Sequence, residues 1–289
     1  MQWLNAVIQG ILLGGLYALL AAGLSLMFGV MRIVNLAHGV LAIVAAYIGF
    51  VFVNNLGVPW YLAIIIVIPI MAVVGYALQW GLFNRALTKG GLAPLLVAFG
   101  LAVVLTQLLQ EIFTADNRRI DTGTLATDSI QVTDTIYLGL LPVMTFVVAV
   151  LVIAGLQLFL NHTPLGRAMR AASDDPDTVK LMGIDNRQVY ALSTALALAT
   201  VGLAGLFIGM KTQFSPTYGD LVLIFAFEAV IIGGLGSLWG TLAGGMVLGI
   251  AQAVGAQINP SYGLLIGNLV FLAILAFRPQ GLFPKAVTT

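Results

Sequence analysis

The chain of 289 residues has no cysteine and little charge, since only 8% of its residues are charged and 2 are histidine. Without cysteine there can be no disulfides, thiolate metal sites or cysteine nucleophiles. His38 and His162 form no HExxH pattern, so we expect no metal site. The net charge of +1 gives no indication of a nucleic-acid partner.

The sequence also lacks a nucleotide-binding motif. No Gly-Lys dipeptide occurs, so the P-loop pattern G-x-x-x-x-G-K-[ST] is absent. The glycine-rich stretch 234–240 resembles a dinucleotide-binding loop only superficially, because its third glycine is one position late and an apolar run precedes it. It indicates a turn or tight backbone packing. No nucleophile, base or metal ligands are clustered, so we expect no enzyme and no cofactor in this chain.

Apolar residues dominate instead. They make up 60% of the chain, the mean hydropathy is +1.06 and there are 33 glycines. A soluble domain carries about 25% charged residues, so the excess apolar surface must face lipid. The runs are too long for barrel strands, and backbone in lipid must satisfy its own hydrogen bonds. We therefore predict an all-α, polytopic transmembrane helical bundle, a single membrane domain over 1–289.

Long apolar runs separated by polar breaks define the expected spans. The second run is interrupted early by Asn35 and His38, and the stretch 233–240 could include a broken or re-entrant element. The first run has no basic segment before it and no signal-peptide cleavage site, so it is interpreted as a retained span. We expect nine spans, within a range of eight to ten, at 6–30, 34–53, 60–83, 91–110, 137–160, 189–210, 219–236, 238–257 and 261–277.

The placement of the 12 basic residues predicts the orientation. If the loop 161–188 is cytoplasmic, three basic residues lie outside: Arg118, Arg119 and Lys211. The other nine lie inside, which favours a cytoplasmic C-terminus and, for an odd number of spans, an external N-terminus. The external loop 111–136 collects five acidic residues, Glu111, Asp116, Asp121, Asp128 and Asp134. The internal basic residues are Arg32, Arg85, Lys89, Arg167, Arg170, Lys180, Arg187, Arg278 and Lys285.

The loop 161–188 contains helix signals of its own. Asp174 or Asp175 is placed to cap a helix whose first residue is Pro176, and Gly183 fits its end. The preceding stretch 166–172 can form another helical turn with two exposed arginines. These short helices suggest a docking surface for a soluble partner, and the alternative is a solvated connector that contacts anionic lipids. The candidate docking residues are Arg167, Arg170, Asp174, Asp175, Lys180, Leu181, Met182 and Gly183.

Three polar residues within the spans are candidates for lining a translocation pathway. Glu228 is the one acidic residue deep inside a span, where a carboxylate must be paired, protonated or hydrated. Asn35 and His38, three residues apart, would lie on one face of a helix. For all three, hydrogen bonding between helices is the structural alternative.

Four segments in order resemble one family, the permease subunits of bacterial branched-chain amino acid ABC importers, over residues 10–283. The match is closest to the H-type permease of the leucine/isoleucine/valine system. The segments are GLYAL at 15–19, MRIVNLAHG at 31–39, PLGRAMRA at 164–171 with LMGI at 181–184, and IIGGLGS at 231–237.

This resemblance implies a bacterial inner-membrane protein that works by alternating access. It implies a heterodimer with a related M-type permease, two cytoplasmic ATPases that use the ATP, and a periplasmic binding protein. It also implies that the loop 164–187 is the coupling helix that enters the ATPase. The cargo stays open between branched-chain amino acids, other amino acids and small amides such as urea. A rival hypothesis is an ion-coupled transporter or channel that uses Glu228 and no ATPase.

Overall fold

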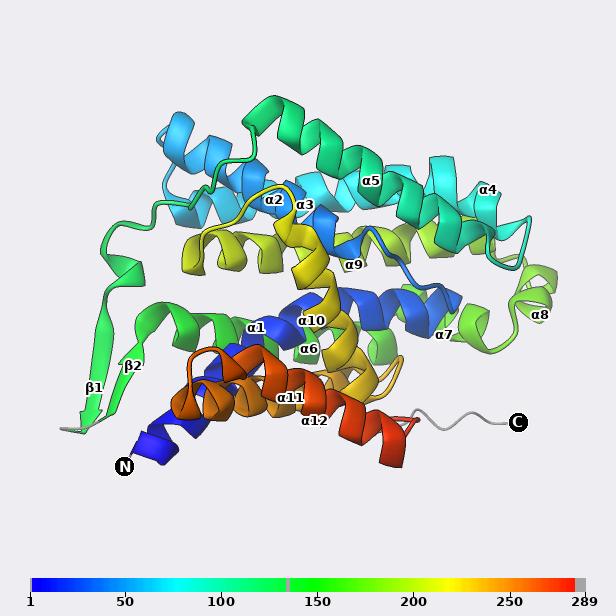
Figure 1. Ribbon diagram of the computed structural model, residues 1–289. Coiled ribbons are helices and arrows are strands. Elements are labelled where there is room, and N and C mark those ends of the chain that lie inside the picture. Colours follow the sequence, from blue (N-terminus) through cyan, green and yellow to red (C-terminus); the bar gives the residue numbers. More distant parts are fainter. Residues whose placement is uncertain (1, 134–135, 284–289) are drawn as a thin grey trace.

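A computed structural model describes residues 2–133 and 136–283 of the chain (Figure 1). Asp134 and Lys285, which entered the charge count of the loops, lie outside the described residues. The first half contains α1 (Gln2–Met31), α2 (His38–Phe50) with a π-helical extension (Val51–Asn55), α3 (Trp60–Leu78) with a second one (Gln79–Phe83), α4 (Asn84–Leu87) and α5 (Ala93–Phe113). The second half contains a 3-10 turn (Gly123–Ala126), β1 (Ser129–Thr133), β2 (Ile136–Gly139), α6 (Leu140–His162), α7 (Pro164–Asp174), α8 (Pro176–Leu181), α9 (Asn186–Lys211), α10 (Tyr218–Gly233), α11 (Leu238–Ile258) and α12 (Tyr262–Phe277).

The predicted helical bundle is confirmed, but fewer than the nine predicted helices are long enough to span a membrane. Seven of the described helices are long and apolar enough to cross a membrane. The other two predicted spans correspond to α10 and α12, with 16 residues each. Such a helix rises about 24 Å, less than the roughly 30 Å hydrocarbon thickness of a bilayer. Within 233–240 the structure has a turn, because α10 ends at Gly233, Gly234 has a φ of +105° and α11 begins at Leu238, while a re-entrant element stays a prediction.

Two other predicted boundaries were wrong. The second helix begins at His38, because residues 32–35 are not helical and Arg32 ends α1 with a φ of 55°. The fifth long helix begins at Leu140, because the preceding residues form β2, which pairs antiparallel with β1. No hairpin was predicted in the loop 111–136.

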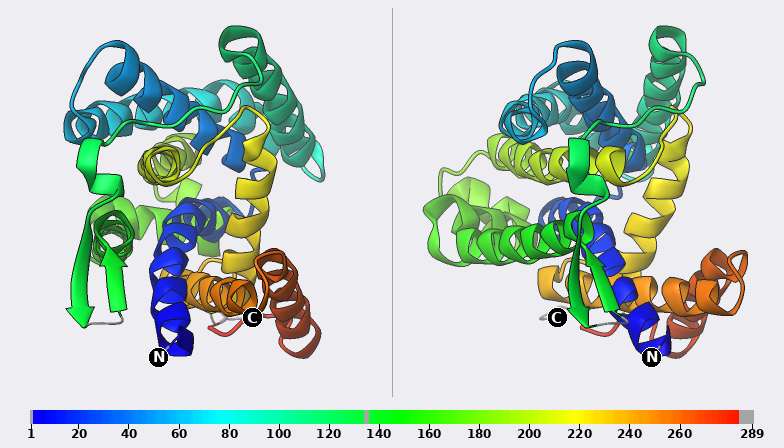
Figure 2. Two further views of the ribbon diagram at one scale, coloured as in Figure 1. Left: turned by 60° about the vertical axis from the view of Figure 1, so that its left-hand side comes forward. Right: turned by 90° about the vertical axis from the view of Figure 1, so that its left-hand side faces the viewer.

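The two ends of the bundle differ in structure (Figure 1). We call them the hairpin end, where β1, β2 and the N-terminus lie, and the α7–α8 end, where the described chain also finishes. The left view of Figure 2 looks along α6 and α9, and α10 runs across this direction. At the hairpin end, Arg118 and Phe214 form an antiparallel bridge that ties the loop after α5 to the α9–α10 connection.

The centre of the bundle is α1, which packs against α6, α9, α10 and α11. Glycines allow the close approach to α11. A Cβ on Gly14 would lie 2.5 Å from Met246 Cα, and one on Gly245 would lie 2.6 Å from the Gly14 carbonyl oxygen. Any larger side chain would push the two backbones apart. The close contact between α1 and α11 therefore requires glycine at these positions.

Candidate functional site

The segment α7–α8 is attached firmly to the end of α6. Thr163 caps α7, since its Oγ1 accepts a hydrogen bond from the Gly166 amide at 2.9 Å. Gly166 allows close contact between the two helices, because a Cβ there would lie 2.5 Å from Leu160 Cα. The short helix predicted around residues 166–172 is thus present, and α6 fixes its position.

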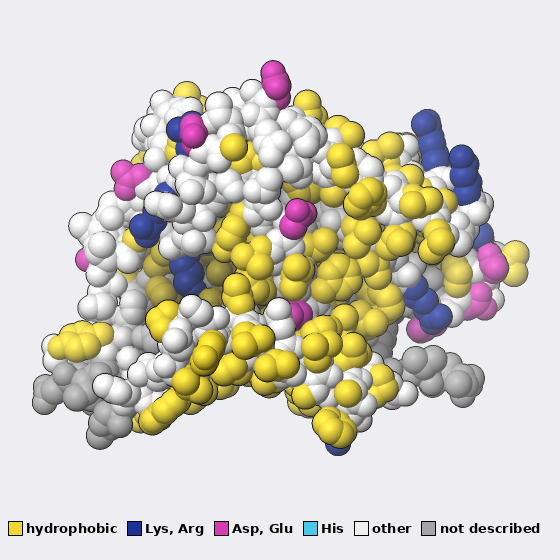
Figure 3. Space-filling view, viewed as in Figure 1, with side chains coloured by type: hydrophobic (Ala, Val, Ile, Leu, Met, Phe, Trp, Pro, Cys, Tyr) yellow, Lys and Arg dark blue, Asp and Glu magenta, His cyan; other side chains and the backbone are white. Residues whose placement is uncertain are grey.

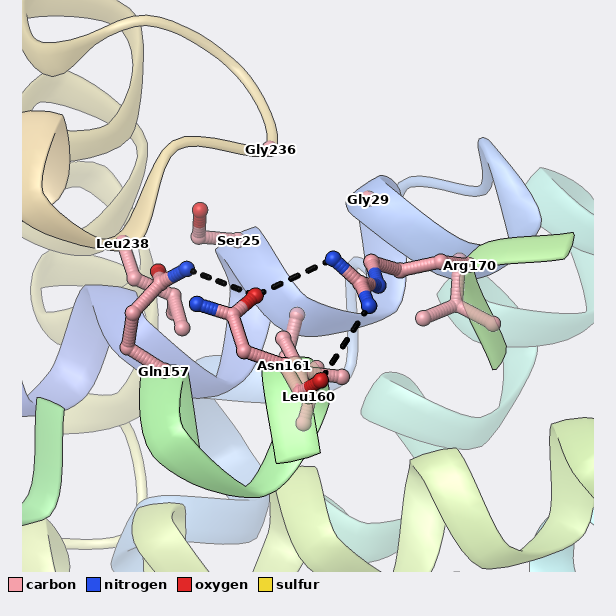
Figure 4. Close-up of a pocket in the computed structure, with 10 residues that line it drawn as sticks. Ser25, Gly29, Gln157, Leu160, Asn161, Arg170, Gly236 and Leu238 are labelled. Atoms are coloured by element: carbon pink, nitrogen blue, oxygen red, sulfur yellow. Dashed lines mark hydrogen bonds between the residues drawn. The ribbon is translucent and has the colours of Figure 1, made fainter. Parts of the chain in front are cut away.

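Two arginines of α7 reach back to the last turn of α6, and Figure 4 shows one of them, Arg170. Arg170 Nη1 donates to Asn161 Oδ1 at 3.1 Å, and Arg167 Nη1 donates to the His162 carbonyl oxygen at 3.2 Å. Unpaired carbonyls and the helix dipole make a helix C-terminus attractive to cations. Both arginines are exposed, but their guanidinium groups bind the chain's own α6.

The opposite side of α7 packs on α1. Met169 and Ala172 are buried in a cluster that includes Met27 and Val30 of α1. Ser173 Oγ donates to the Gly29 carbonyl oxygen at 2.5 Å. A displacement of α7 would therefore be transmitted to two long helices, α6 and α1.

The next helix, α8, is capped as the sequence predicts. Of the two candidate caps, Asp175 accepts hydrogen bonds from the Asp177 and Thr178 amides at 3.1 and 3.0 Å, while Asp174 is the last residue of α7. Hydrogen bonds from the Thr178 hydroxyl and amide lower the pKa of the Asp175 carboxyl. Gly183 follows the helix with a φ of +81°, which favours glycine.

The tip of α8 presents apolar side chains to the outside. Leu181 is 89% exposed and Met182 is 74% exposed. Behind them Val179 is buried, and Asn186 Nδ2 donates to the Pro176 carbonyl oxygen at 2.6 Å. Lys180 pairs with Asp177 at 2.8 Å, which raises the pKa of its ammonium group. The exposed tip is thus held on an ordered support.

A small pocket of about 80 Å³ lies beside this attachment, between α1, α6, α7 and the turn after α10 (Figure 4). Arg170 and Gln157 line it on one side, and Gln157 Nε2 donates to Asn161 Oδ1 at 3.4 Å. Ser25 lies on the other side, and its buried hydroxyl has no partner within residues 2–133 and 136–283.

Asn35 and His38 were expected to lie on one face of a helix, but they do not, because Asn35 is not in a helix. Asn35 precedes α2, and its Oδ1 accepts a hydrogen bond from the Ala37 amide at 3.0 Å. His38 is fully buried at the start of α2, and its Nε2 donates to the Leu20 carbonyl oxygen of α1 at 2.8 Å. This geometry supports the packing alternative, while a role in a pathway stays a prediction.

Glu228 lies in α10 and is 4% exposed. Its Oε1 accepts a hydrogen bond at 2.9 Å from Asn268 of α12, in the amide orientation that satisfies both groups. Its Oε2 has no partner among the described residues. One carboxylate oxygen thus links two helices and the other is free.

The sequence missed Asn161 and Ser173, which connect α7 to α6 and α1. Their only local signal is a polar side chain near a helix end, which is common. The tertiary contacts that give them a role depend on the packing of three helices.

A bundle of apolar helices with an ordered polar appendage at one end defines a polytopic membrane protein, built like a permease. The sequence matches the family described as the branched-chain amino acid transport system permease component over residues 6–275. The chain belongs to this family and is a transport component.

Two relatives match along nearly the whole chain, and a third matches about half of it. The high-affinity branched-chain amino acid transport system permease protein BraD of Pseudomonas aeruginosa is 28% identical, over 98% of this chain and 96% of its own length. The protein LivH of the corresponding system in Escherichia coli is 25% identical, over 99% of this chain and 96% of its own. A second permease protein of the Escherichia coli high-affinity branched-chain amino acid transport system, LivM, is 28% identical over 49% of this chain and 34% of its own length. Transporters of this type therefore have a second permease subunit.

Proposed function

We propose that this chain and a second, related permease form the path by which branched-chain or similar apolar amino acids cross a bacterial inner membrane. The family and the names of its relatives support this cargo. The near absence of charge within the helices also fits, because an apolar cargo needs only a weakly binding path.

In this proposal two separate ATPases supply the energy, and a periplasmic binding protein delivers the cargo at the hairpin end. The α7–α8 end is cytoplasmic. The distribution of basic residues supports this orientation, because the described basic residues at the α7–α8 end are Arg32, Arg85, Lys89, Arg167, Arg170, Lys180, Arg187 and Arg278. The absence of a P-loop in the sequence is consistent with external ATPases.

The observation that carries the proposal is the exposed apolar tip of α8 on a supported α7. Leu181 and Met182 would fill an apolar groove in an ATPase. Movement of this tip would shift α7, then α6 through Arg167 and Arg170. It would also reach α1 through Ser173. That sequence of contacts would couple nucleotide hydrolysis to reorientation of the bundle.

The test is transport of radiolabelled leucine by the complete transporter in proteoliposomes, with the Leu181→Glu, Met182→Glu double variant. We expect a loss of at least about tenfold in transport and in co-purified ATPase, because two buried contacts would become charged. Leu56→Glu is the matched control, since Leu56 is 64% exposed and follows α2 at the hairpin end. It should leave ATPase binding unchanged. Normal ATPase binding by the double variant would disprove the docking assignment.

A second variant separates docking from transmission. Arg167→Glu with Arg170→Glu would remove the three hydrogen bonds that these arginines donate to α6. We expect the ATPases to stay bound and to hydrolyse ATP, while transport falls by about tenfold because the movement of α7 no longer reaches α6. Full transport by the assembled double variant would contradict this mechanism.

The ion-coupled alternative rests on Glu228, whose Oε2 is free. The purified chain alone in liposomes would then take up leucine in response to a proton or sodium gradient, and Glu228→Gln would abolish uptake. An ATP-driven permease should show no such uptake, and the Glu228→Gln variant of the complete transporter should keep most of its activity.

A further inference from the structure

A second cavity, of about 190 Å³, lies toward the hairpin end where α1, α9 and α10 meet. Figure 3 shows that the molecule is hollowed on this face and that apolar side chains dominate the hollow. Leu16 and Val222 form part of the apolar wall, with Tyr17, Phe225, Tyr218 and Lys211 adding aromatic and polar groups. In the sequence analysis Lys211 was counted only as a charge, and Leu16 and Tyr17 appeared only within the segment 15–19.

Lys211 is the last residue of α9 and lines the cavity half-buried. The ion pairs in the described part of the chain are Arg118–Asp116 and Lys180–Asp177, so no described carboxylate lies within 4.0 Å of the Lys211 ammonium. A partly desolvated charge without a counterion is unfavourable. An anionic group that enters the cavity would therefore be stabilised there.

Three aromatic side chains, Tyr17, Tyr218 and Phe225, are part of the cavity lining. The rings of Tyr17 and Phe225 lie 4.8 Å apart, and the Tyr17 hydroxyl donates to Gln252 Oε1 at 2.5 Å. The Tyr17 hydroxyl hydrogen is used in this bond, but the hydroxyl oxygen can still accept a hydrogen bond from an ammonium group. Aromatic faces also attract cations. The cavity thus offers a cation for a carboxylate, acceptors for an ammonium group and apolar walls for an aliphatic side chain.

We infer that this cavity is a transient binding site for a zwitterionic apolar amino acid, in which Lys211 binds the carboxylate. The inference rests on the proposed function and identifies where the cargo is held after delivery. One charge and few hydrogen bonds give weak binding, as a transporter needs for release.

Two unpaired polar atoms lie near this site, one on α10 and one on α11. Glu228 is one helical turn beyond Phe225, and its Oε2 has no partner in the described chain. Gln252 Nε2, next to the Tyr17 hydroxyl, also lacks one. Neither residue lines the cavity, so neither takes part in the proposed contacts with the cargo.

The experiment compares Lys211→Gln and Lys211→Arg in the complete transporter in proteoliposomes, with radiolabelled leucine and its binding protein. We expect Lys211→Gln to lower transport at least about tenfold, because a charge-assisted contact is lost, and Lys211→Arg to keep most of it. Val222→Trp, which fills the cavity, should also block transport. Lys89→Gln is the matched control, since Lys89 is also a lysine, is exposed and does not line the cavity.

The readouts distinguish this site from other roles. Stimulation of the ATPase by leucine-loaded binding protein should stay normal in Lys211→Gln, since docking and coupling are intact. Loss of that stimulation would make Lys211 a docking residue and overturn the inference. Normal transport by both Lys211→Gln and Val222→Trp would also overturn it. If the wild-type assembly transports no amino acid, the proposed function itself fails.

Discussion

Two helices of similar hydropathy, α1 and α5, have opposite positions in the bundle. Their most apolar 18-residue windows have mean hydropathies of 2.1 and 1.9, yet 83% of the α1 window is buried and only 11% of the α5 window. Hydropathy therefore identifies lipid as the solvent but does not decide which helix is central. Lipid is as apolar as leucine, so no hydrophobic force selects the inner helix.

Small residues and polar contacts determine which helix lies at the centre of the bundle. In α1, Gly14 lies against the backbone of α11, and the Leu20 carbonyl and Tyr17 hydroxyl bond to other helices. In α5, a Cβ on Gly100 would meet nothing within 4 Å. Glycine is therefore required for packing at position 14 of α1, whereas at position 100 of α5 it contacts no described residue.

The largest effect should come from Gly14→Leu. The new side chain would meet the backbone of α11, which cannot move aside without separating the helices. We expect a destabilisation of at least about 3 kcal/mol, above the usual range for overpacking because the obstacle is backbone. Thermal unfolding of the purified protein in detergent would measure it.

Gly100→Leu is the matched control and should change the free energy of unfolding by less than about 0.5 kcal/mol. Equal melting temperatures for the two variants would mean that α1 and α11 do not approach as closely as described. A Gly100→Leu variant that is stable alone but fails to bind the second permease would place that partner on α5.

Leu20→Ala and Leu108→Ala should differ in their loss of unfolding free energy by an amount smaller than the effect of Gly14→Leu. Leu20 is 1% exposed, so its truncation leaves a cavity and should cost about 2–3 kcal/mol. Leu108 is 50% exposed on α5, where lipid fills the space, and the change should stay below about 0.5 kcal/mol. Unfolding titrations in mixed micelles measure both. Similar losses would show that α5 is packed against protein in the micelle.

What could be predicted from the sequence was local. The caps of α8 follow from Asp175, Pro176 and Gly183, because they act on the backbone of their own helix. The long helices follow from apolar runs that need no partner to satisfy the backbone. The start of α2 at His38 was missed because hydropathy averages over a short polar break.

What depends on packing could not be predicted. The course of α10 across the bundle and the bonds from Arg170 to α6 require neighbours distant in the chain. Lys211 looked like any basic residue at a helix end, and only the fold places it beside Tyr17 and Tyr218. The proposed contacts therefore involve polar side chains whose surroundings the sequence does not reveal.

The smallest effect should come from Tyr17→Phe, which removes one hydroxyl and leaves Gln252 Oε1 without its donor. Hydrogen bonds between membrane helices contribute about 0.6 kcal/mol on average and up to about 1.7 kcal/mol. We therefore expect the free energy of unfolding to decrease by an amount within that range. Tyr61→Phe, at a 54% exposed position in α3, is the control and should have no measurable effect. If both variants unfold like the wild type, polar contacts do not help to hold α1 at the centre, and the small residues alone account for its position.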